Sequence, residues 1–221
     1  MIEVTYVDHM GSDLSVVNAA RVSFGKESLW NWSKELDSDT GDGRTLRERD
    51  TKLIHYLAKH RHMSPFGHAF ASFHVKAPIF VARQLVKHKF LRWNEISRRY
   101  VDDDPEFYVP DAWRGRSVDK KQGSDGVVGT DTLVGSSEYN HHCKTFYQDL
   151  IDSDIAPEQA RMVLPQSTMT EWYWSGSLDA FIDMCNLRCK EDTQLETRLV
   201  ADYIRSEMIK LFPVSVEALV K

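Results

Sequence analysis

The chain has 221 residues, of which 42% are hydrophobic and 28% charged, and it carries a formal net charge of −5 at neutral pH. A chain of this length can bury a sizeable core, and we expect one domain over residues 1–221. No stretch approaches the roughly 18 consecutive apolar residues of a membrane helix, which argues against a membrane role. The acidic balance argues against a general nucleic-acid-binding protein, for which a basic excess is expected.

The N-terminal sequence and the cysteine content bear on the cellular compartment in which the protein is expected. The first residues lack the basic start and apolar core of a secretory signal, so the mature chain should begin near Met1. The three cysteines, Cys143, Cys185 and Cys189, form an odd set without a disulfide framework. This usage predicts a reducing, cytoplasmic location. Because Cys185 and Cys189 stand four apart in an apolar helical pattern, we expect buried thiols on one helix face rather than half of a metal site.

The first 44 residues predict a strand, a helix and an irregular segment. A loose alternation of β-rich residues favours a strand over 2–7, and an apolar pattern favours a short helix over 14–22. From residue 26 to residue 44 the composition shifts to Ser, Asp, Gly and Trp. This shift predicts an irregular excursion.

A second helix and a histidine-containing loop follow. Thr45 and Glu48 form a capping-box pattern at the start of a helix that should end near His60. The next motif, HMSPFGHA, breaks the helix at its proline. It therefore places His62 and Ser64 on a loop.

The middle of the chain predicts a strand that leads into a third helix. The alternation in FASFHVKA favours a strand over 70–77, and Pro78 suits the first turn of a helix that continues toward Phe90. Lys87 and Lys89 fall at the C-terminal end of this helix, where cations complement the helix dipole. Their presence there does not by itself require a ligand.

The second half of the chain is predicted to be mainly helical after a long surface loop. Residues 102–137 are first acidic and then rich in Gly, Ser and Asp, and 113–137 should be irregular. A β-branched and aromatic run favours one strand over 168–175. The remaining patterns predict helices over 138–151, 157–163, 177–189 and 193–212.

A dense group of cations stands out in this acidic chain. Glu95 is the only acid among Arg83, Lys87, Lys89, Arg92, Arg98 and Arg99, and His88, Asn94 and Ser97 lie among them. Arginine offers a planar fork for phosphate or for a base edge, and lysine offers a point charge, so the segment could hold a nucleotide. From composition alone, two other interpretations stay open: a solvated charged helix end, and a nucleic-acid patch at 83–99 with Phe90, Trp93 and Tyr100 as stacking residues.

The histidines raise the alternative of a metal-dependent nucleotide hydrolase. The chain has nine histidines, including His60, His62 and the pair His141 and His142. Their spacing matches neither HExxH nor a His-Asp phosphohydrolase pattern, and no conspicuous carboxylate accompanies them. We therefore expect no metal site.

The spacing within the basic segment is more specific than its composition. His88, Asn94, Ser97, Arg99 and Tyr100 fall at the fixed positions of the motif RHRxxSxNxxSxRY, and in this respect the chain resembles the flavin-dependent thymidylate synthases. Other motifs typical of that family follow in the same order across most of the chain: Ala19–Phe24 (AARVSF), His62–His68 (HMSPFGH), Phe73–Gln84 (FHVKAPIFVARQ), Ala160–Pro165 (ARMVLP) and Asn186–Arg188 (NLR).

The resemblance implies a fold, a reaction and an assembly. The implied fold is α+β, with helices packed around a small mixed or antiparallel sheet. The implied reaction is the conversion of dUMP to dTMP, with methylenetetrahydrofolate as carbon donor, FAD as hydride carrier and NADPH as reductant. The family is homotetrameric, with active sites shared between subunits.

The resemblance also assigns site residues. Arg188 is the candidate catalytic residue, because a permanent cation beside the uracil ring would stabilise negative charge there and make C5 a better nucleophile. The implied dUMP-binding residues are Gln84, Leu85, Val86, Lys87, Glu95, Ile96, Ser97, Arg98, Arg99, Arg161 and Arg188. The implied FAD-binding residues are His62, Ser64, Lys87, His88, Lys89, Glu95, Ser177, Asp179 and Asp183.

Some residues depart from the family motif, and one invites a different role. Lys87 and Lys89 stand where arginine is usual, and Arg92 stands where the first serine is usual. Asp192 falls where relatives often have a histidine near the flavin and the folate. We expect Ser97 to bind nucleotide rather than act as a nucleophile, because no Ser-His-acid set can be placed beside it.

Overall fold

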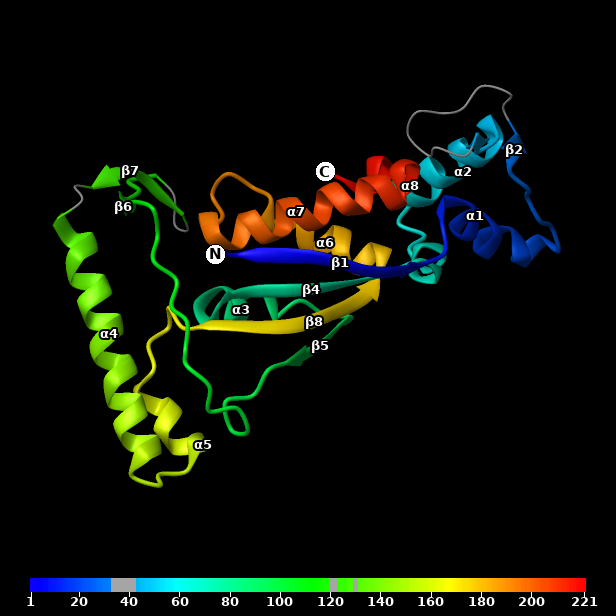
Figure 1. Cartoon of the computed structure of the whole chain (residues 1–221). Coiled ribbons are helices and arrows are strands. Elements are labelled where there is room, and N and C mark those ends of the chain that lie inside the picture. Colours follow the sequence, from blue (N-terminus) through cyan, green and yellow to red (C-terminus); the bar gives the residue numbers. More distant parts are fainter. Residues whose placement is uncertain (33–42, 120–122, 129–130) are drawn as a thin grey trace.

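A four-stranded antiparallel sheet forms the centre of the molecule. The computed structural model describes residues 1–32, 43–119, 123–128 and 131–221, with the side chains of 131–134 left out (Figure 1). The strand order is β1 (Glu3–Met10), β4 (Phe70–Pro78), β8 (Met169–Ser177) and β5 (Leu91–Glu95), and every neighbouring pair is antiparallel. The expected α+β fold around a small sheet is confirmed, and the sheet is antiparallel rather than mixed.

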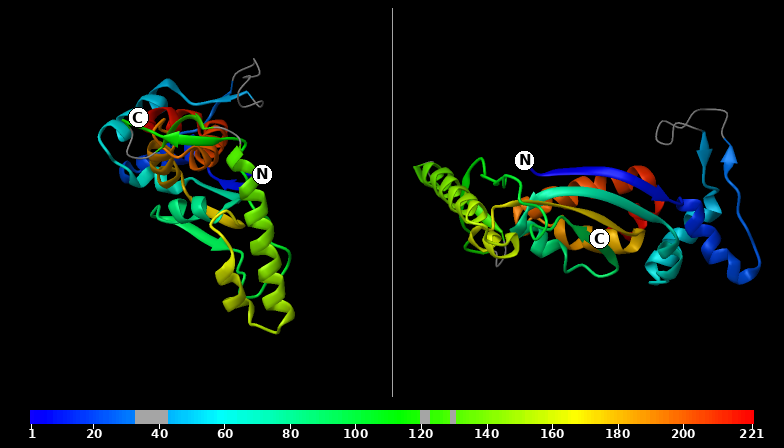
Figure 2. Two further views of the ribbon diagram at one scale, coloured as in Figure 1. Left: turned by 90° about the vertical axis from the view of Figure 1, so that its left-hand side faces the viewer. Right: turned by 60° about the horizontal axis from the view of Figure 1, so that its bottom comes forward.

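The remaining elements surround this sheet. Figure 1 and the turned views of Figure 2 show α4 standing as an arm at one end of the molecule, with α1 and α2 at the opposite end. In the described part of the chain, no helix is long and apolar enough to cross a membrane. The helices are α1 (Asp13–Arg21), α2 (Glu48–Lys59), α3 (Ile79–Leu85), α4 (Asp131–Asp152), α5 (Pro157–Ala160), α6 (Leu178–Arg188), α7 (Leu195–Leu211) and α8 (Pro213–Leu219), with 3-10 turns η1 (Val22–Phe24), η2 (Ser64–His68) and η3 (Arg161–Val163). Two strand pairs complete the fold: β2 (Asn31–Trp32) with β3 (Arg44–Thr45), and β6 (Trp113–Arg116) with β7 (Ser124–Val128).

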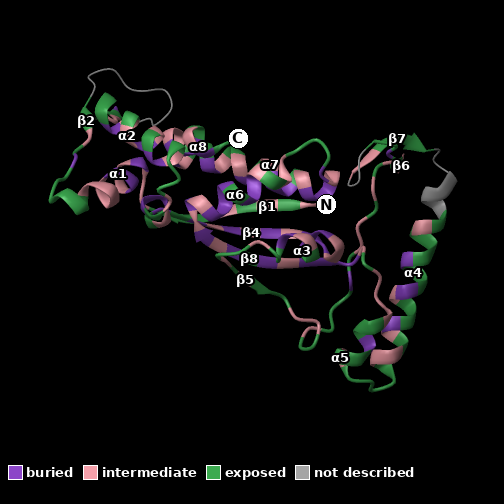
Figure 3. Ribbon diagram, turned by 180° about the vertical axis from the view of Figure 1, so that it is seen from behind, coloured by how far each residue is buried: buried purple, intermediate pink, exposed green. Residues whose placement is uncertain are grey.

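The core lies on one face of the sheet. Strand residues alternate between the two faces, and those that face α6 and α7 are buried, which Figure 3 shows as the purple stretches of β4 and β8. The ring of Phe181 in α6 packs edge-on against the rings of Phe73 and Trp174, with centroid-to-centroid distances of 5.2 Å and 5.5 Å. Burial of side chains of this size contributes about 1.5–3 kcal/mol each, so this packing holds α6 on the sheet.

The C-terminal helix α8 is anchored by a residue from the start of the chain. The carboxylate of Asp13 accepts the backbone N–H groups of Val214 and Ser215, each at 2.9 Å. Burial raises the pKa of Asp13. This helix was not predicted, because its N-terminal cap is supplied from a residue about 200 positions away.

The predicted extension of the third helix toward Phe90 is wrong. Helix α3 ends at Leu85, Phe90 adopts a left-handed φ of 64°, and Leu91–Glu95 forms β5. Leu91 and Trp93 alternate with the exposed Arg92 and Asn94. This period of two is typical of a half-buried strand, but the charged residues around it obscured the pattern.

Three local predictions also need correction. The described residues of 113–137 are not all irregular, because they include the paired strands β6 and β7 and the first residues of α4. In the excursion over 26–44, the β2–β3 pair forms from its two ends, and residues 33–42 lie outside the described part. The capping box is absent: Arg47 occupies the N-cap of α2, and Thr45 lies in β3, where its hydroxyl donates to the carbonyl of Asn31 at 3.4 Å.

Close packing between β8 and β5 makes a glycine necessary at position 176. A Cβ atom there would lie 2.9 Å from the carbonyl oxygen of Phe90 and would overlap the side chain of Leu91. We predict that Gly176→Ala lowers the free energy of unfolding by about 1–3 kcal/mol, because β5 must move away from β8. Urea denaturation would measure the change.

Gly135→Ala is the matched control, because a Cβ atom at this position in α4 meets nothing within 4 Å. Replacing this helical glycine should stabilise the protein by about 0.5–1 kcal/mol. Equal unfolding free energies for Gly176→Ala and the wild type would contradict the proposed constraint.

Candidate active site

Arg188 lies at the centre of a half-buried polar cluster. It is the last residue of α6, where its Nε donates to His88 Nε2 at 3.0 Å and its second guanidinium nitrogen donates to the carbonyl oxygen of Gln84 at 3.3 Å. Burial, followed by the positive charge of Arg188, lowers the pKa of His88 to about 4. His88 is therefore neutral near pH 7 and accepts through Nε2, while Arg188 keeps its charge.

Two further cations flank this cluster. Lys87 and Lys89 lie in the turn after α3, where both are exposed. Neither forms an ion pair with another described residue. Their ammonium groups are therefore available to an anionic ligand.

The carboxylate of Glu95 is held by two donors. The Thr170 hydroxyl donates to Oε1 at 2.7 Å, and the Trp93 indole N–H donates to Oε2 at 3.0 Å. Trp93 is itself fixed by stacking on Trp172, with ring centroids 4.3 Å apart. The sheet thus orients the carboxylate before any ligand binds.

A tight turn carries the next four residues of the motif. The Ser97 carbonyl accepts the N–H groups of Tyr100 and Val101, and the Ser97 hydroxyl accepts from Arg99 Nε at 3.1 Å. Arg99 also lies over the Tyr100 ring, with its guanidinium carbon 4.9 Å from the ring centroid. Arg98 turns away and donates to Asp103. Among the described contacts of Ser97 there is no histidine.

Arg161 joins the same neighbourhood. A small cavity of about 130 Å³ is lined by Glu95, Ile96, Arg98 and Arg161, among others. Arg161 is exposed, and its Nε donates only to the carbonyl of Glu158 in the described part of the chain. This arrangement leaves most of its guanidinium free to bind a ligand.

The structure therefore divides the implied dUMP-binding residues into two groups. One group surrounds Arg188 with Gln84–Lys87, and the other surrounds the turn 95–99 with Arg161. In the described residues, no hydrogen bond, ion pair or pocket joins the two groups.

The other implied FAD-binding residues gather near the start of α6. Ser177 occupies the N-cap of α6 without making a side-chain capping bond, and Asp179 lies in the first turn. Turn η2, which begins at Ser64, packs against α6, and His62 is exposed just before it. Asp183 is also exposed. The Oδ1 atom of Asp179 is buried without a hydrogen-bond partner.

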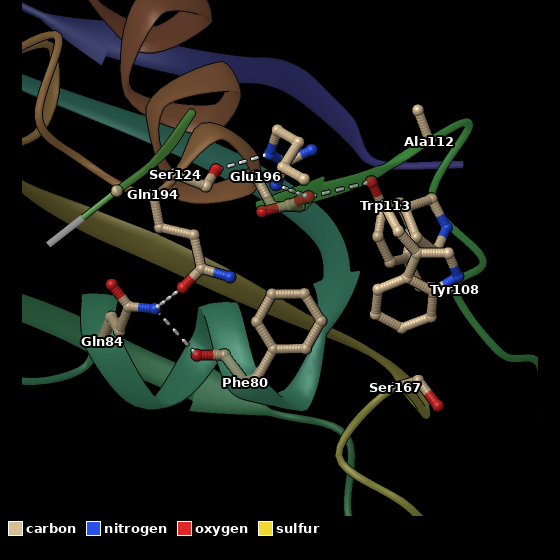
Figure 4. A pocket seen from close by; sticks show the side chains of 12 residues that line it. Phe80, Gln84, Tyr108, Ala112, Trp113, Ser124, Ser167, Gln194 and Glu196 are labelled. Atoms are coloured by element: carbon tan, nitrogen blue, oxygen red, sulfur yellow. Dashed lines mark hydrogen bonds and ion pairs between the residues drawn. The ribbon is translucent and has the colours of Figure 1, made fainter. Parts of the chain in front are cut away.

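The sequence analysis missed a larger pocket beside Gln84. It has a volume of about 700 Å³ and lies between the β6–β7 hairpin and helices α3 and α7 (Figure 4). Burial, followed by the charge of Glu196, raises the pKa of Tyr108 in its wall to about 12. Only Gln84 had been implicated, because the lining residues belong to no shared motif and meet only in the folded chain: Phe80, Gln84, Tyr108, Pro110, Ala112, Trp113, Arg114, Gly123, Ser124, Ser167, Gln194 and Glu196.

The cysteines and histidines show no metal-binding arrangement. In the described residues, no three His, Cys, Asp or Glu side chains come together in a way that could hold a metal ion. Cys185 is buried as expected, whereas Cys189 is partly exposed at the C-cap of α6.

The neutral state of His88 can be tested directly. We predict that its imidazole titrates with a midpoint near pH 4, measured from the ring proton shifts by NMR and assigned with a His88→Asn variant. Since the folded pKa lies below the ordinary value of 6.5, the unfolded chain binds more protons between these values. The contribution of His88 to stability is therefore lost as the pH falls through that window.

Arg188→Ala provides the control for the electrostatic part of this shift. The variant should move the His88 midpoint upward, because the neighbouring positive charge is removed while burial remains. A wild-type midpoint near 6.5 would contradict the described geometry.

Three comparisons with known proteins identify the family. The family model described as "Thymidylate synthase complementing protein" matches residues 5–214. The chain is 39% identical over 208 residues to a flavin-dependent thymidylate synthase of Thermus thermophilus, covering 94% of this chain and 71% of that one. It is 37% identical over 221 residues to a flavin-dependent thymidylate synthase of Thermosipho africanus, covering 97% and 89%.

A solved structure is similar over nearly the whole fold. The crystal structure of the UMP/dUMP methylase PolB from Streptomyces cacaoi, bound with 5-Br dUMP, has a TM-score of 0.81 and 33% sequence identity, covering 99% of this chain and 94% of that one. Sequence and fold therefore agree with the motif spacing around His88 and Arg99. The chain belongs to the flavin-dependent thymidylate synthase family and is an enzyme of that family.

Proposed function

We propose that the protein methylates dUMP reductively to dTMP, with methylenetetrahydrofolate as carbon donor, FAD as hydride carrier and NADPH as reductant. The observation that carries the proposal is the Arg188 cluster, in which a permanent cation is held by a neutral histidine. Support also comes from the similar methylase, which was crystallised with a brominated dUMP.

Arg188 has the properties needed to activate the pyrimidine. Negative charge on the N3 and carbonyl edge of uracil makes C5 more nucleophilic toward the one-carbon unit, and a fixed cation stabilises that charge. Because His88 accepts a hydrogen bond from Arg188 and is neutral near pH 7, it adds no second positive charge in contact with Arg188. Arg188 needs no proton transfer to act in this way.

The remaining dUMP residues suit the phosphate and sugar. We propose that Gln84–Lys87 bind the nucleotide from the subunit that supplies Arg188, and that Arg161 binds it from the subunit that supplies Glu95–Arg99. Glu95–Arg99 would reach the same nucleotide from another subunit, with the Ser97 hydroxyl, Arg99 and backbone N–H groups as phosphate donors. This arrangement agrees with the separation of the two groups within one chain, and it motivates our proposal of a homotetramer.

The residues proposed for FAD fit its chemistry in part. The free cations Lys87 and Lys89 suit its diphosphate, although lysine lacks the fork of the arginine usual in the family. The unpartnered Oδ1 of Asp179 is an acceptor that a flavin or ribose donor would satisfy. We assign His62, Ser64, His88, Glu95, Ser177 and Asp183 to the same site. When bound, FAD would accept hydride from NADPH and pass it on during methylation.

The proposed function predicts a yellow protein whose flavin band bleaches with NADPH. The band should return when dUMP and methylenetetrahydrofolate are added together without oxygen, and dTMP should form. Arg188→Ala should keep the flavin but lower the rate of dTMP formation by about 10²–10³-fold, because stabilisation of the ionised ring is lost. Absorption spectra and product chromatography would measure both effects.

Arg49→Ala is the control for loss of an arginine, because Arg49 lies on α2 with 59% of its side chain exposed. It should leave turnover unchanged. A protein that takes up no FAD would refute the function, and normal turnover by Arg188→Ala would refute the role of Arg188 alone.

The shared site predicts complementation between inactive variants. Arg188→Ala and Arg99→Ala should each lose nearly all activity alone. Because each site would take Arg188 from one chain and Arg99 from another, coexpression in equal amounts should restore up to about a quarter of the sites. A site built within a single chain would recover no activity, and turnover of the purified mixture decides between the two.

A further inference from the structure

The large pocket beside Gln84 is a preformed cavity with aromatic walls. Phe80 of α3 and Tyr108 meet edge-on with ring centroids 6.0 Å apart, and Trp113 of β6 forms the side contributed by the hairpin (Figure 4). Three aromatic rings from separate segments thus surround a volume of about 700 Å³. Walls of this kind favour a flat, largely apolar ring.

The charges in the pocket lining cancel. Arg114 pairs with Glu196 at 2.5 Å, and the described lining contains no other charged side chain. Among the described lining residues, a phosphate would therefore find no free cation. Because the phosphate of a mononucleotide lies close to its ring, this pocket does not suit dUMP, whereas a ring on a longer tether can enter while its anionic groups stay outside.

The polar atoms of the pocket define an edge for the ring. Glu196 is 2% exposed, and its Oε1 is occupied by Arg114 and Tyr108, but its Oε2 is buried without a hydrogen-bond partner. The carboxamide oxygen of Gln194 accepts from Gln84 at 2.6 Å, so its NH₂ group is the donor side. Figure 4 shows this carboxamide between Gln84 and Phe80. The pocket thus combines an acceptor that lacks a donor with an amide donor.

We propose that this pocket binds a planar ring with an amide-type edge, in which a carbonyl oxygen lies next to an N–H group. The N–H group would donate to Glu196 Oε2, and the carbonyl would accept from Gln194. One co-substrate of the proposed function carries such an edge on a long tether: the lactam of a reduced pterin, whose carboxylates lie beyond an aminobenzoyl group. The nicotinamide of NADPH does not suit the pocket, because its diphosphate is attached through the ribose next to the ring, as the phosphate of dUMP is. The inference rests on the proposed function for this source.

Gln84 connects the pocket to the Arg188 cluster. Its side chain donates to Gln194 in the pocket, while its backbone carbonyl accepts from Arg188. The occupant would therefore lie next to the proposed methylation centre, separated from Arg188 by one residue of α3.

The test uses ligand-observed NMR on the flavin-loaded full-length protein without turnover. Saturation-transfer spectra and titrations would be recorded separately with NADP⁺ and with 5-formyltetrahydrofolate. Trp113→Ala removes one wall and should be tolerated, because Trp113 is 39% exposed. Gln194→Glu keeps the shape but replaces the amide donor with an acceptor. Trp32→Ala is the control, since Trp32 is an exposed tryptophan of β2 that does not line the pocket.

We expect 5-formyltetrahydrofolate to bind about tenfold more weakly in both pocket variants, with NADP⁺ binding and the Trp32→Ala control unchanged. Weaker binding of NADP⁺ alone would overturn the proposal. Wild-type affinities for both ligands in both variants would overturn the proposal, as would equal weakening of both ligands, which indicates general damage to the hairpin. Failure of the proposed function appears separately, as a wild-type protein that takes up no flavin or forms no dTMP.

Discussion

The pairing of β8 with strands on both sides is the constraint on which the rest of the structure depends. Its register with β4 and β5 sets Trp172 and Trp174 on the covered face, where α6 packs, and Tyr173 on the open face. Gly176 allows the backbone of Phe90 to approach closely, so that β5 can end the sheet. Since β5 carries the middle of the motif that runs from Lys87 to Tyr100, an error in this one pairing would displace Glu95 from Thr170.

The electrostatics of the site follow from burial more than from the number of cations. The basic segment looked like a single patch, but its side chains point to different partners once it folds into a turn, a strand and a second turn. His88 loses its charge because it is half-buried beside Arg188. One cation is therefore held in a defined position, while Lys87 and Lys89 remain in solvent. This distribution does not resemble the continuous basic face that a nucleic-acid-binding surface needs.

Two ligand environments of opposite character lie on either side of Gln84. The Arg188 cluster carries net positive charge, whereas the aromatic pocket is neutral because Arg114 and Glu196 compensate one another. In our proposals this contrast separates the ligand groups by their chemistry, with the anionic nucleotide on one side and an uncharged ring on the other. The β6–β7 hairpin, which lines one side of the pocket, contacts the loop after α6. Gly123, directly before β7, lies so close to the backbone of Asp192 in that loop that a Cβ atom would not fit.

The sequence by itself determined the family, most of the helices and strands, and the identity of the candidate site residues, because periodicity and motif spacing are local properties of the chain. Only the tertiary structure decided how those residues are grouped. Strand β5 was missed because the charged residues around it obscure its period of two, and α8 was missed because Asp13 caps it from the other end of the chain. The aromatic pocket left no signal either, since Phe80, Trp113 and Glu196 are distant in sequence and acquire a common role only by packing together.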